Sequence, residues 1–364
     1  MDILTAMVQI NLINRMQAPM KLITATMIVD LIRDIGVSEF YKELTIMLEN
    51  DFRNWNKFNK SPRHAVHFPE GVIELMPCSD DTYYSFKYVN GHPGNTEQGK
   101  LSVFALGMLS DVRTGYPLIL SEMTLLTAFR TAATSAIASK YMARKNSSAV
   151  SIIGTGSQSE FQIMALKNIF RIHKVKCFDR DKNAMLKFKK NLAGEFENIE
   201  ICSTAEEAVA GSDIIITATA DKKHARLFDP SSVREGTHIN AVGGDCPGKT
   251  ELDLNLLKRS RVVVEYLEQT RLEGEIQLNE IPQVHGELWE IISGIKPGRE
   301  NENEITIFDS VGFALEDFST LKLIYQMMEK RGQGEAVDLI PEPDDPKNLY
   351  GLISGGKNSP DAFN

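Results

Sequence analysis

From Ala149 onward, short apolar runs rich in β-branched residues alternate with segments of helical pattern, and this alternation constrains the fold more than any other feature of the chain. Strand, crossover helix and strand repeated in this way predict a parallel sheet with helices on both faces. We therefore expect a doubly wound α/β fold over residues 149–313. The six runs are AVSIIG (149–154), KVKCFD (174–179), NIEIC (198–202), DIIITATA (213–220), HINAV (238–242) and RVVVEY (261–266).

The residues before this region follow a different pattern. Two helical patterns, ATMIVDLIRDIG and EFYKELTIMLENDFRNW, precede four predicted strands and a long helix from about Thr124 to Arg144. Strands clustered ahead of the alternation predict a separate α+β domain over residues 21–148. After the strand ITIFDSVG, an amphipathic helix predicts that residues 314–340 return to pack on this domain. Residues 1–20 are then an N-terminal extension and 341–364 an irregular tail. The four strands are GVIELMP, YYSFKYV, LSVFALGML and GYPLILSEM.

Composition restricts the partners of the chain. Its 364 residues include 49 acidic and 40 basic side chains, a net charge of -9, and we expect no nucleic acid partner because that requires a basic face. The four cysteines form no C-x-x-C pair, which predicts neither zinc nor disulfides but a reducing cytoplasm. No apolar run approaches the ~20 residues of a membrane span. The histidines near residues 64–92 match no compact metal site, so we assign no metal.

A glycine motif, GTGSQS, follows the first α/β run at Gly154 and precedes a helical segment. Gly154 fits the tight turn, Gly156 lets backbone N–H groups approach a pyrophosphate, and the helix N-terminus stabilises its charge. Ser159 stands where a third glycine is usual, which weakens the motif. Asp179 ends the second run, where an acid binds the ribose hydroxyls of NAD and disfavours a 2′-phosphate. The sequence therefore predicts a Rossmann-type NAD site; Arg180 leaves NADP open, and a simple turn at Asp179 is the alternative.

A second glycine stretch, GGDCPGKT, begins at Gly243 and matches the pattern G-x-x-x-x-G-K-[ST] of nucleotide hydrolases. Asp245 would repel a triphosphate, and Pro247 removes an N–H donor from the cradle. A sheet of this kind also collects its ligands near one topological switch point. We therefore reject an ATPase and expect Asp245, at the carboxyl end of the fifth run, to act as an acid on a bound substrate.

Three charged residues of the first domain lie in apolar surroundings: Glu74 in VIELM, Lys87 in YYSFKYV and Arg130 in LLTAFRTAATSA. Buried charges are normally paired or bound to a ligand. One interpretation is a structural pair of Glu74 with Lys87, and alternation leaves a solvated face open to either residue. The other is an amino-acid site, in which these cations and Arg63 bind a carboxylate and Glu74 binds an ammonium group.

Blocks in order along the chain resemble the ornithine cyclodeaminase/mu-crystallin family, which also includes some alanine dehydrogenases. The resemblance runs from about Leu22 to Leu339, and GGDCPGKTELD and FKYVNGHP resemble the cyclodeaminases more than the wider family. The other blocks are RHAVHFPEGVIELMP, LSEMTLLTAFRTAATSA, GTGSQSEFQ, VEYLEQTRLEGEI and IFDSVGFALEDF.

The resemblance implies conversion of L-ornithine to L-proline and ammonia with no net redox change. Bound NAD would accept hydride from Cα, the terminal amine would close the ring, ammonia would leave, and the same cofactor would reduce the cyclic imine. It also implies that residues 21–148 bind substrate and form a homodimer, since their strands would otherwise present unpaired edges.

Matched motif by motif, the resemblance implies that Asp245 and Glu74 are the catalytic acids. The implied substrate contacts are Arg63, Lys87, Arg130, Lys249 and Val311. The implied cofactor contacts are Ser102, Arg130, Gly154, Gly156, Ser157, Gln158, Asp179, Thr219, Asn240, Ala241 and Ser310.

Three alternatives stay open at this point. An amino-acid dehydrogenase would use the same cofactor but accumulate NADH. A cyclodeaminase for lysine or a shorter diamino acid would act on a substrate that differs from ornithine by one methylene. A binding pocket discriminates between two such substrates by only ~1–3 kcal/mol. A non-catalytic ligand-binding protein of the mu-crystallin kind would keep the glycine loop but would need no acid at Asp245.

Overall fold

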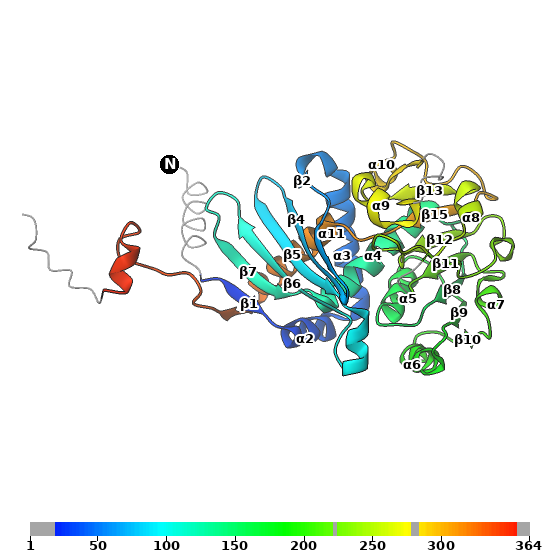
Figure 1. Ribbon diagram of the computed structural model, residues 1–364, viewed down its shortest axis with the longest axis horizontal. Coiled ribbons are helices and arrows are strands. Elements are labelled where there is room, and N and C mark those ends of the chain that lie inside the picture. Colours follow the sequence, from blue (N-terminus) through cyan, green and yellow to red (C-terminus); the bar gives the residue numbers. More distant parts are fainter. Residues whose placement is uncertain (1–18, 221–223, 278–283, 355–364) are drawn as a thin grey trace, which may run out of the picture.

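The computed structural model describes residues 19–354 apart from 221–223 and 278–283 (Figure 1). Nearly all of the expected N-terminal extension therefore lies outside the described residues. Within them, the chain forms two eight-stranded sheets with helices between them, and the fold is α/β as predicted. No helix in this described part is long and apolar enough to cross a bilayer.

The second sheet is doubly wound and parallel throughout, in the order β10-β9-β8-β11-β12-β15-β13-β14. The chain proceeds outward from β8 on one side and from β11 on the other, so the strand order reverses between them. Such a reversal opens a ligand crevice at the carboxyl ends of the strands. The strands are β8 (Ala149–Ile153), β9 (Lys174–Phe178), β10 (Ile199–Ile201), β11 (Ile214–Thr217), β12 (His238–Ala241), β13 (Arg261–Val264), β14 (Gly286–Glu287) and β15 (Thr306–Asp309).

Helices cover both faces of this sheet, as its sequence requires. Every residue of β11, β12 and β15 is buried. β11 is almost entirely apolar, and the buried polar residues His238 and Asn240 of β12 are hydrogen-bonded to Thr306 and Ser139. The crossover helices are α5 (Ser159–Lys167), α6 (Lys182–Leu192), α7 (Ala205–Val209), α8 (Leu254–Lys258), α9 (Leu267–Glu273) and α10 (Leu288–Ile292).

The first sheet is mostly antiparallel, in the order β16-β1-β7-β6-β5-β4-β2, with β3 also paired to β4. Its register places Met76 beside Lys87 and Lys87 beside Gly107, so these residues share the inner face. The strands are β1 (Lys21–Ile23), β2 (Asn59–Lys60), β3 (His64–Phe68), β4 (Gly71–Ser79), β5 (Tyr83–Gly91), β6 (Val103–Asp111), β7 (Pro117–Glu122) and β16 (Glu335–Ala336).

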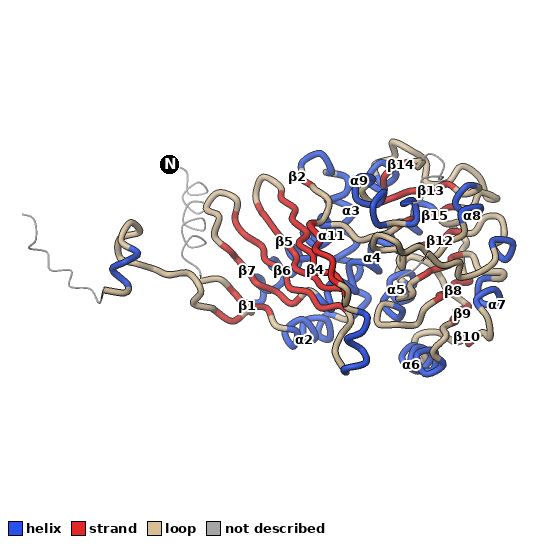
Figure 2. The backbone as a smooth tube through the Cα atoms, in the orientation of Figure 1, coloured by secondary structure: helices blue, strands red, loops and turns tan. Residues whose placement is uncertain are grey.

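Long helices fill the space between the two sheets (Figure 2). They are α3 (Val37–Arg53), α4 (Thr124–Met142) and α11 (Ala314–Arg331), and α2 (Ala25–Ile35) precedes α3 along the chain. α4 is rich in Ala, Ser and Thr and is buried on nearly all sides, with hydroxyls such as that of Ser139 bonded to carbonyls four residues back. Among the described helices, none covers the outer face of the first sheet (Figure 1).

The C-terminal helix is shorter than the sequence indicated. α11 ends at Arg331, because Gly332 takes a left-handed conformation with φ of 64° and closes the helix. Glu335 and Ala336 then form β16 at the edge of the first sheet, antiparallel to β1. Residues 314–331 are thus the helical part of the expected 314–340 segment.

Candidate active site

The predicted site residues gather between the carboxyl ends of the second sheet's strands and the inner face of the first sheet. β8, β11, β12 and β15 end in the segments that carry Gly154, Thr219, Asp245 and Ser310. α11 begins directly after Phe313, so its first turn faces the same place. The topology therefore brings together residues that are far apart in the sequence.

The first glycine loop has the shape of an anion cradle. Gly154 has φ of +97°, and a Cβ there would lie 2.5 Å from the carbonyl oxygen of Ala218, so only glycine fits this turn. Around Gly156, in contrast, no neighbouring atom of the described residues lies within 4 Å of an added Cβ. The buried Oε1 of Gln158 has no hydrogen-bond partner within the described residues. An open backbone loop that leads into α5 fits a pyrophosphate.

Asp179 lies beside this loop at the end of β9. One of its carboxylate oxygens accepts hydrogen bonds from Thr155, from the N–H at 2.6 Å and the hydroxyl at 3.1 Å. The other accepts the N–H of Asp181. The acid is therefore fixed at the position from which a ribose is bound in such folds.

The other residues predicted to contact the cofactor lie in three different parts of the fold. Thr219 lies after β11 and donates its N–H to Glu251. Asn240 and Ala241 are buried in β12, where the Asn240 amide donates to Ser139 of α4. Ser102 lies just before β6, and its carbonyl accepts the N–H of His92. Their contacts with a cofactor stay predictions.

Arg63 joins the two halves of the molecule. Its side chain is 7% exposed, and one terminal nitrogen lies 2.9 Å from Glu74 on the first sheet. The other donates to the carbonyls of Val311 and Gly312, each at 2.6 Å, while Nε lies 3.1 Å from Glu273 on α9. Burial alone would lower the pKa of Arg63, but the carboxylates of Glu74 and Glu273 outweigh burial and raise it. The guanidinium is thus a fixed cation.

Lys87 and Arg130 meet the first turn of α11. Lys87, on β5, lies 2.8 Å from Asp317, and Arg130, on α4, lies 2.6 Å from Glu316 and 3.1 Å from Asp317. Burial and the neighbouring Arg130 lower the pKa of Lys87 to about 8. The structure pairs Glu74 with Arg63 and Lys87 with Asp317, in place of the direct Glu74–Lys87 pair left open above.

These cations keep unused donor capacity. Within the described residues, neither the Nε of Arg63 nor that of Arg130 has a hydrogen-bond partner, although a carboxylate lies 3.1 Å from each. A ligand carboxylate matches such donors in charge and geometry. The arrangement can therefore hold a carboxylate.

Asp245 follows β12, at the carboxyl end of the second sheet. Its side chain is 52% exposed, and Oδ1 lies 3.1 Å from the ammonium group of Lys249, which is 6% exposed. Burial would lower the pKa of Lys249, but Asp245 and Glu251 raise it. Asp245 also acts electrostatically on Arg63 and Glu273, which places it toward the cation cluster. A half-exposed carboxylate held by a buried cation is suited to exchange protons with a substrate.

Behind this loop lie buried acids that sequence reasoning did not find. Glu251 accepts from Thr219, Glu275 accepts the N–H groups of Glu251 and Leu252, and Asp309 accepts those of Glu275 and Ile276. Burial raises the pKa values of Glu251 and Glu275, and that of Asp309 to about 7. These acids therefore retain protons at pH values where exposed carboxylates do not.

Four further acids around the cations were also missed. Glu265 accepts bonds from the Ser310 hydroxyl and from the N–H groups of Val311 and Gly312, and so fixes the segment to which Arg63 also bonds. Burial raises the pKa of Glu273 to about 7. The only available signal was the density of acids in VEYLEQTRLEGE and in LEDF. The four are Glu265, Glu273, Glu316 and Asp317.

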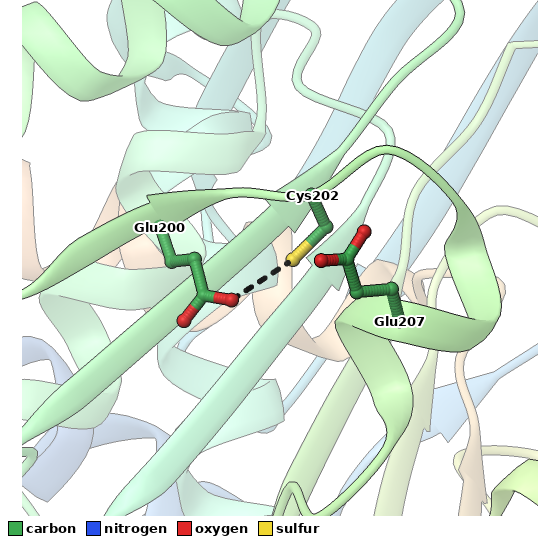
Figure 3. A group of neighbouring side chains, drawn as sticks. All are labelled: Glu200, Cys202 and Glu207. Atoms are coloured by element: carbon green, nitrogen blue, oxygen red, sulfur yellow. Dashed lines mark hydrogen bonds between the residues drawn. The ribbon is translucent and has the colours of Figure 1, made fainter.

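A separate polar group lies at the far edge of the second sheet (Figure 3). Ligand atoms of Glu200, Cys202 and Glu207 lie within 4.8 Å of one another. Glu200 is paired with Lys174 at 2.6 Å, and Glu207 accepts the N–H of Ser203. Burial, followed by Glu200, raises the pKa of the Cys202 thiol to about 11, which disfavours the thiolate that binds metals. We assign no metal to this group.

Comparison with known proteins places the chain in a family. The model of the ornithine cyclodeaminase/mu-crystallin family matches residues 25–332. Ornithine cyclodeaminase of Brucella melitensis is 52% identical over 325 residues, which cover 89% of this chain and 90% of that protein.

Solved structures agree with this placement. A lysine cyclodeaminase, whose structure concerns recognition of L-lysine, L-ornithine and L-2,4-diaminobutyric acid, superposes with a TM-score of 0.86 and 28% identity, covering 92% of this chain and 99% of that one. An archaeal alanine dehydrogenase dimer with bound NAD gives 0.81 and 35%, covering 88% and 99%. With its crevice and buried cations in place, the chain belongs to the ornithine cyclodeaminase/mu-crystallin family.

Proposed function

We infer that this protein is an NAD-dependent ornithine cyclodeaminase, which converts L-ornithine to L-proline and ammonia. The relative at 52% identity carries that name, and it matches the chain over nearly its whole length. The observation in the structure that supports the inference best is the group of three buried cations beside a half-exposed acid. A substrate with a carboxylate at one end and amines beside it fits that arrangement.

We propose that Arg63, Lys87 and Arg130 bind the substrate carboxylate. Each is buried and already paired with an acid, so the free energy needed to desolvate the cations is offset within the protein before substrate arrives. The two guanidinium Nε groups supply donors that the paired acids leave free. Fixing the carboxylate at this point would orient Cα toward the crevice and limit the positions of the chain that must close into a ring.

We propose that Asp245 moves the amine protons and that Glu74 holds the amino group near Cα. An amine attacks only when unprotonated, so a carboxylate must accept its proton before ring closure. The ammonium group of Lys249 donates to Oδ1 of Asp245 at 3.1 Å and so holds that side chain in place. Val311 adds its backbone carbonyl next to Arg63.

The residues of the first glycine loop fit the cofactor. NAD, when bound, supplies the two-electron redox chemistry at the substrate Cα. Gly156 would leave backbone N–H groups open to its pyrophosphate, with Ser157 and Gln158 just before α5, while the N–H of Gly154 donates to the carbonyl of Phe178. Asp179 would hold the ribose hydroxyls and exclude a 2′-phosphate, and Ser310, next to Glu265, would lie on the other side of the crevice.

The reaction itself tests this function. Purified protein incubated with L-ornithine and NAD is expected to release ammonia and proline in equal amounts without accumulating NADH. Absorbance at the NADH band, followed together with ammonia, separates this from the alternatives. Steady NADH formation would identify an amino-acid dehydrogenase, and ligand binding without turnover would identify a non-catalytic protein.

Chain length of the substrate is the finer question. The related lysine cyclodeaminase was solved for recognition of L-lysine, L-ornithine and L-2,4-diaminobutyric acid. We propose L-ornithine as the preferred substrate here because the more similar relative carries that name. A panel of the three diamino acids, assayed for kcat/KM by ammonia release, tests this preference, and a higher value for lysine would reassign it.

We also propose a homodimer formed through the outer face of the first sheet. Leu75 on β4, Tyr84 on β5 and Phe104 and Leu106 on β6 are 36–44% exposed there, alternating with buried residues. A contiguous apolar face of this kind marks an interface, and a related alanine dehydrogenase was solved as a dimer. Sedimentation of the purified protein is expected to give twice the chain mass. None of the four cysteines forms a disulfide within the described residues, and we propose a cytoplasmic location.

A further inference from the structure

Two fully buried carboxyl groups meet beside Arg130. Glu265 follows β13, Glu316 lies in the first turn of α11, and both are 0% exposed. Their side chains are hydrogen-bonded to each other. Two ionised carboxylates have only acceptor oxygens, so a hydrogen bond between these groups requires a proton on one of them. The other partners of each acid show which one carries it.

Glu265 is bonded as a carboxylate. Its Oε1 accepts the hydroxyl of Ser310 at 2.7 Å. Its Oε2 accepts the N–H groups of Val311 at 3.0 Å and of Gly312 at 2.7 Å. Both oxygens are therefore used as acceptors, and three donors to one carboxyl group stabilise its ionised form.

Glu316 is bonded as a carboxylic acid. Its Oε2 accepts a hydrogen bond from Arg130 at 2.6 Å. Its Oε1 is buried and, within the described residues, receives no hydrogen bond from an N–H or hydroxyl group. A buried carboxylate oxygen without a donor is costly, whereas a protonated oxygen can donate to Glu265. Burial, and next the adjacent Glu265, raise the pKa of Glu316 well above its usual range.

The charges around this pair of acids show what the proton does. Lys87 and Arg130 carry two positive charges, and Asp317 carries one negative charge next to both. If both acids of the pair were ionised, three carboxylates would face two cations, and the group would repel a ligand carboxylate. With one proton on the pair, the group is neutral. Arg63 adds no excess of positive charge, because it is itself paired with Glu74.

We propose that Glu265 and Glu316 share one proton, carried by Glu316, and that this proton lets a ligand carboxylate approach Arg130 and Lys87. A buried acid kept neutral by its surroundings can donate a hydrogen bond that a carboxylate cannot. Glu316 is then a positioning residue that acts through Arg130. The inference rests on the carboxylate site of the proposed function and goes beyond it, because it assigns a protonation state and a role to an acid outside that site.

Glutamine tests where the proton lies, because its amide has the shape of a protonated carboxyl group. Glu316→Gln can accept from Arg130 and donate to Glu265, so its midpoint of urea unfolding should match that of the wild type. Glu265→Gln places an NH₂ group against donors and should unfold at a lower urea concentration. Equal shifts for the two variants, or a Glu316→Gln protein that does not fold, would overturn the proposal.

Infrared difference spectroscopy detects the proton directly. The spectrum of the wild type minus that of Glu316→Gln, at neutral pH, should contain the C=O stretching band of a protonated carboxyl group. Glu39→Gln, at an exposed position on α3, is the control, for which only carboxylate bands are expected. If the Glu316 difference also contains only carboxylate bands, the proposal is wrong.

Binding of a simple carboxylate tests the consequence of the proton. Pentanoate has the carboxylate and carbon chain of ornithine but no amine, so the protein cannot turn it over. Its dissociation constant, from calorimetric titration of the NAD-loaded protein, should agree within about threefold between the wild type and Glu316→Gln. A larger change in either direction would overturn the proposal. If Glu316 were ionised, removing its charge should strengthen binding by about tenfold or more.

The proposed function can fail separately from this inference. None of the three measurements involves turnover, so a protein that does not form proline from ornithine would refute the function and leave the shared proton in place. A wild-type protein that binds no pentanoate would refute the carboxylate site and, with it, the consequence proposed for the proton.

Discussion

The two glycine loops at the carboxyl ends of β8 and β12 look alike in sequence and differ in what lies behind them. The loop at Gly154–Ser159 leads into α5, and at Gly156 it is open to solvent. In the loop at Gly243–Thr250, a Cβ on Gly243 would lie 2.0 Å from the Glu251 carboxylate, and one on Gly244 2.5 Å from Glu275. The first loop offers backbone donors to an anion. The second is packed on Glu251 and Glu275, whose pKa values burial raises, and it presents Asp245.

This difference shows why a pattern of glycines does not by itself define a phosphate site. Glycine permits close approach, but the approaching group differs between the two loops. At the second loop the protein's own carboxyl groups approach the glycines, and at the first loop we propose that the cofactor does so. The sequence at Gly243 therefore matches the P-loop pattern, but the loop lacks the backbone N–H donors and the helix N-terminus that a phosphate site requires. The protein's own carboxyl groups pack against it instead.

The largest effect is expected at the acid that the second loop presents. Asp245→Asn should lower kcat by about 10² or more, because the amide cannot accept an amine proton. NAD binding and the melting temperature should change little, since the side chain is 52% exposed. Steady-state kinetics with L-ornithine measures this. Asp81→Asn, in the exposed turn between β4 and β5, is the control, and unchanged turnover in Asp245→Asn would remove Asp245 from the mechanism.

A methyl group in the second loop should disturb the protein even without ligands. Gly243→Ala would press on Glu251, which two bonds from Thr219 hold in place. Overpacking of this kind destabilises by ~1–3 kcal/mol. Urea unfolding of the cofactor-free protein checks it. If Gly243→Ala unfolds at the same urea concentration as the wild type, the loop is packed less tightly against Glu251 than the structure indicates.

The same methyl group in the first loop should act only on the cofactor. Gly156→Ala meets no protein atom within 4 Å, so urea unfolding without cofactor should match the wild type. NAD affinity should fall roughly tenfold, equivalent to ~1.4 kcal/mol, because the methyl group occupies the space of the pyrophosphate. Calorimetric titration with NAD measures this loss, and full affinity would place the pyrophosphate elsewhere.

The raised pKa of Glu273, the buried acid beside Arg63, predicts a pH dependence of stability. Burial raises the pKa of Glu273 from its usual 4.5 to about 7. The folded state therefore binds this proton more tightly than the unfolded state, and the stability it contributes is complete below pH 4.5 and is lost as the pH rises through 7. Glu273→Gln should make the fall in unfolding free energy over this range shallower. Urea titrations at several pH values test this, and an identical slope would contradict it.

The smallest effect is expected at the ribose end of the first loop. Asp179→Ala should reduce the preference for NAD over NADP by about tenfold, since the repulsion of a 2′-phosphate is lost while Arg180 remains. Competition binding of the two cofactors measures the ratio. An unchanged ratio would show that another group distinguishes them.

The sequence predicted the second sheet well because its strands are buried on both faces. AVSII and RVVV are nearly continuous apolar runs, whereas KVKCF alternates between half-buried lysines and the buried Val175 and Cys177. Each forms a strand within a residue or two of the run. The first sheet's long strands were also found. β1, β2, β3, β14 and β16 were not predicted, and two-residue strands such as Gly286–Glu287 and Glu335–Ala336 have no periodicity to detect.

The cations of the site were predictable and their partners were not. Lys87 and Arg130 stand out because a charge in an apolar strand or helix is rare. Glu316 and Asp317 begin an amphipathic helix, where acids are usual in the first turn for reasons unrelated to a site. Only the crossing of α11 between the two sheets turns those acids toward the cations.

Arg63 gives the site a mechanical consequence. One guanidinium bonds to Glu74 on the first sheet and to Glu273, Val311 and Gly312 on the second-sheet side. On the proposed function, a substrate carboxylate that accepts hydrogen bonds from Arg63 would compete with those contacts, so ligand binding and the link between the two sheet regions would depend on one side chain. Substrate binding would therefore change the stiffness of the link between the first-sheet and second-sheet regions, and relaxation measurements on each region would detect the bound ligand.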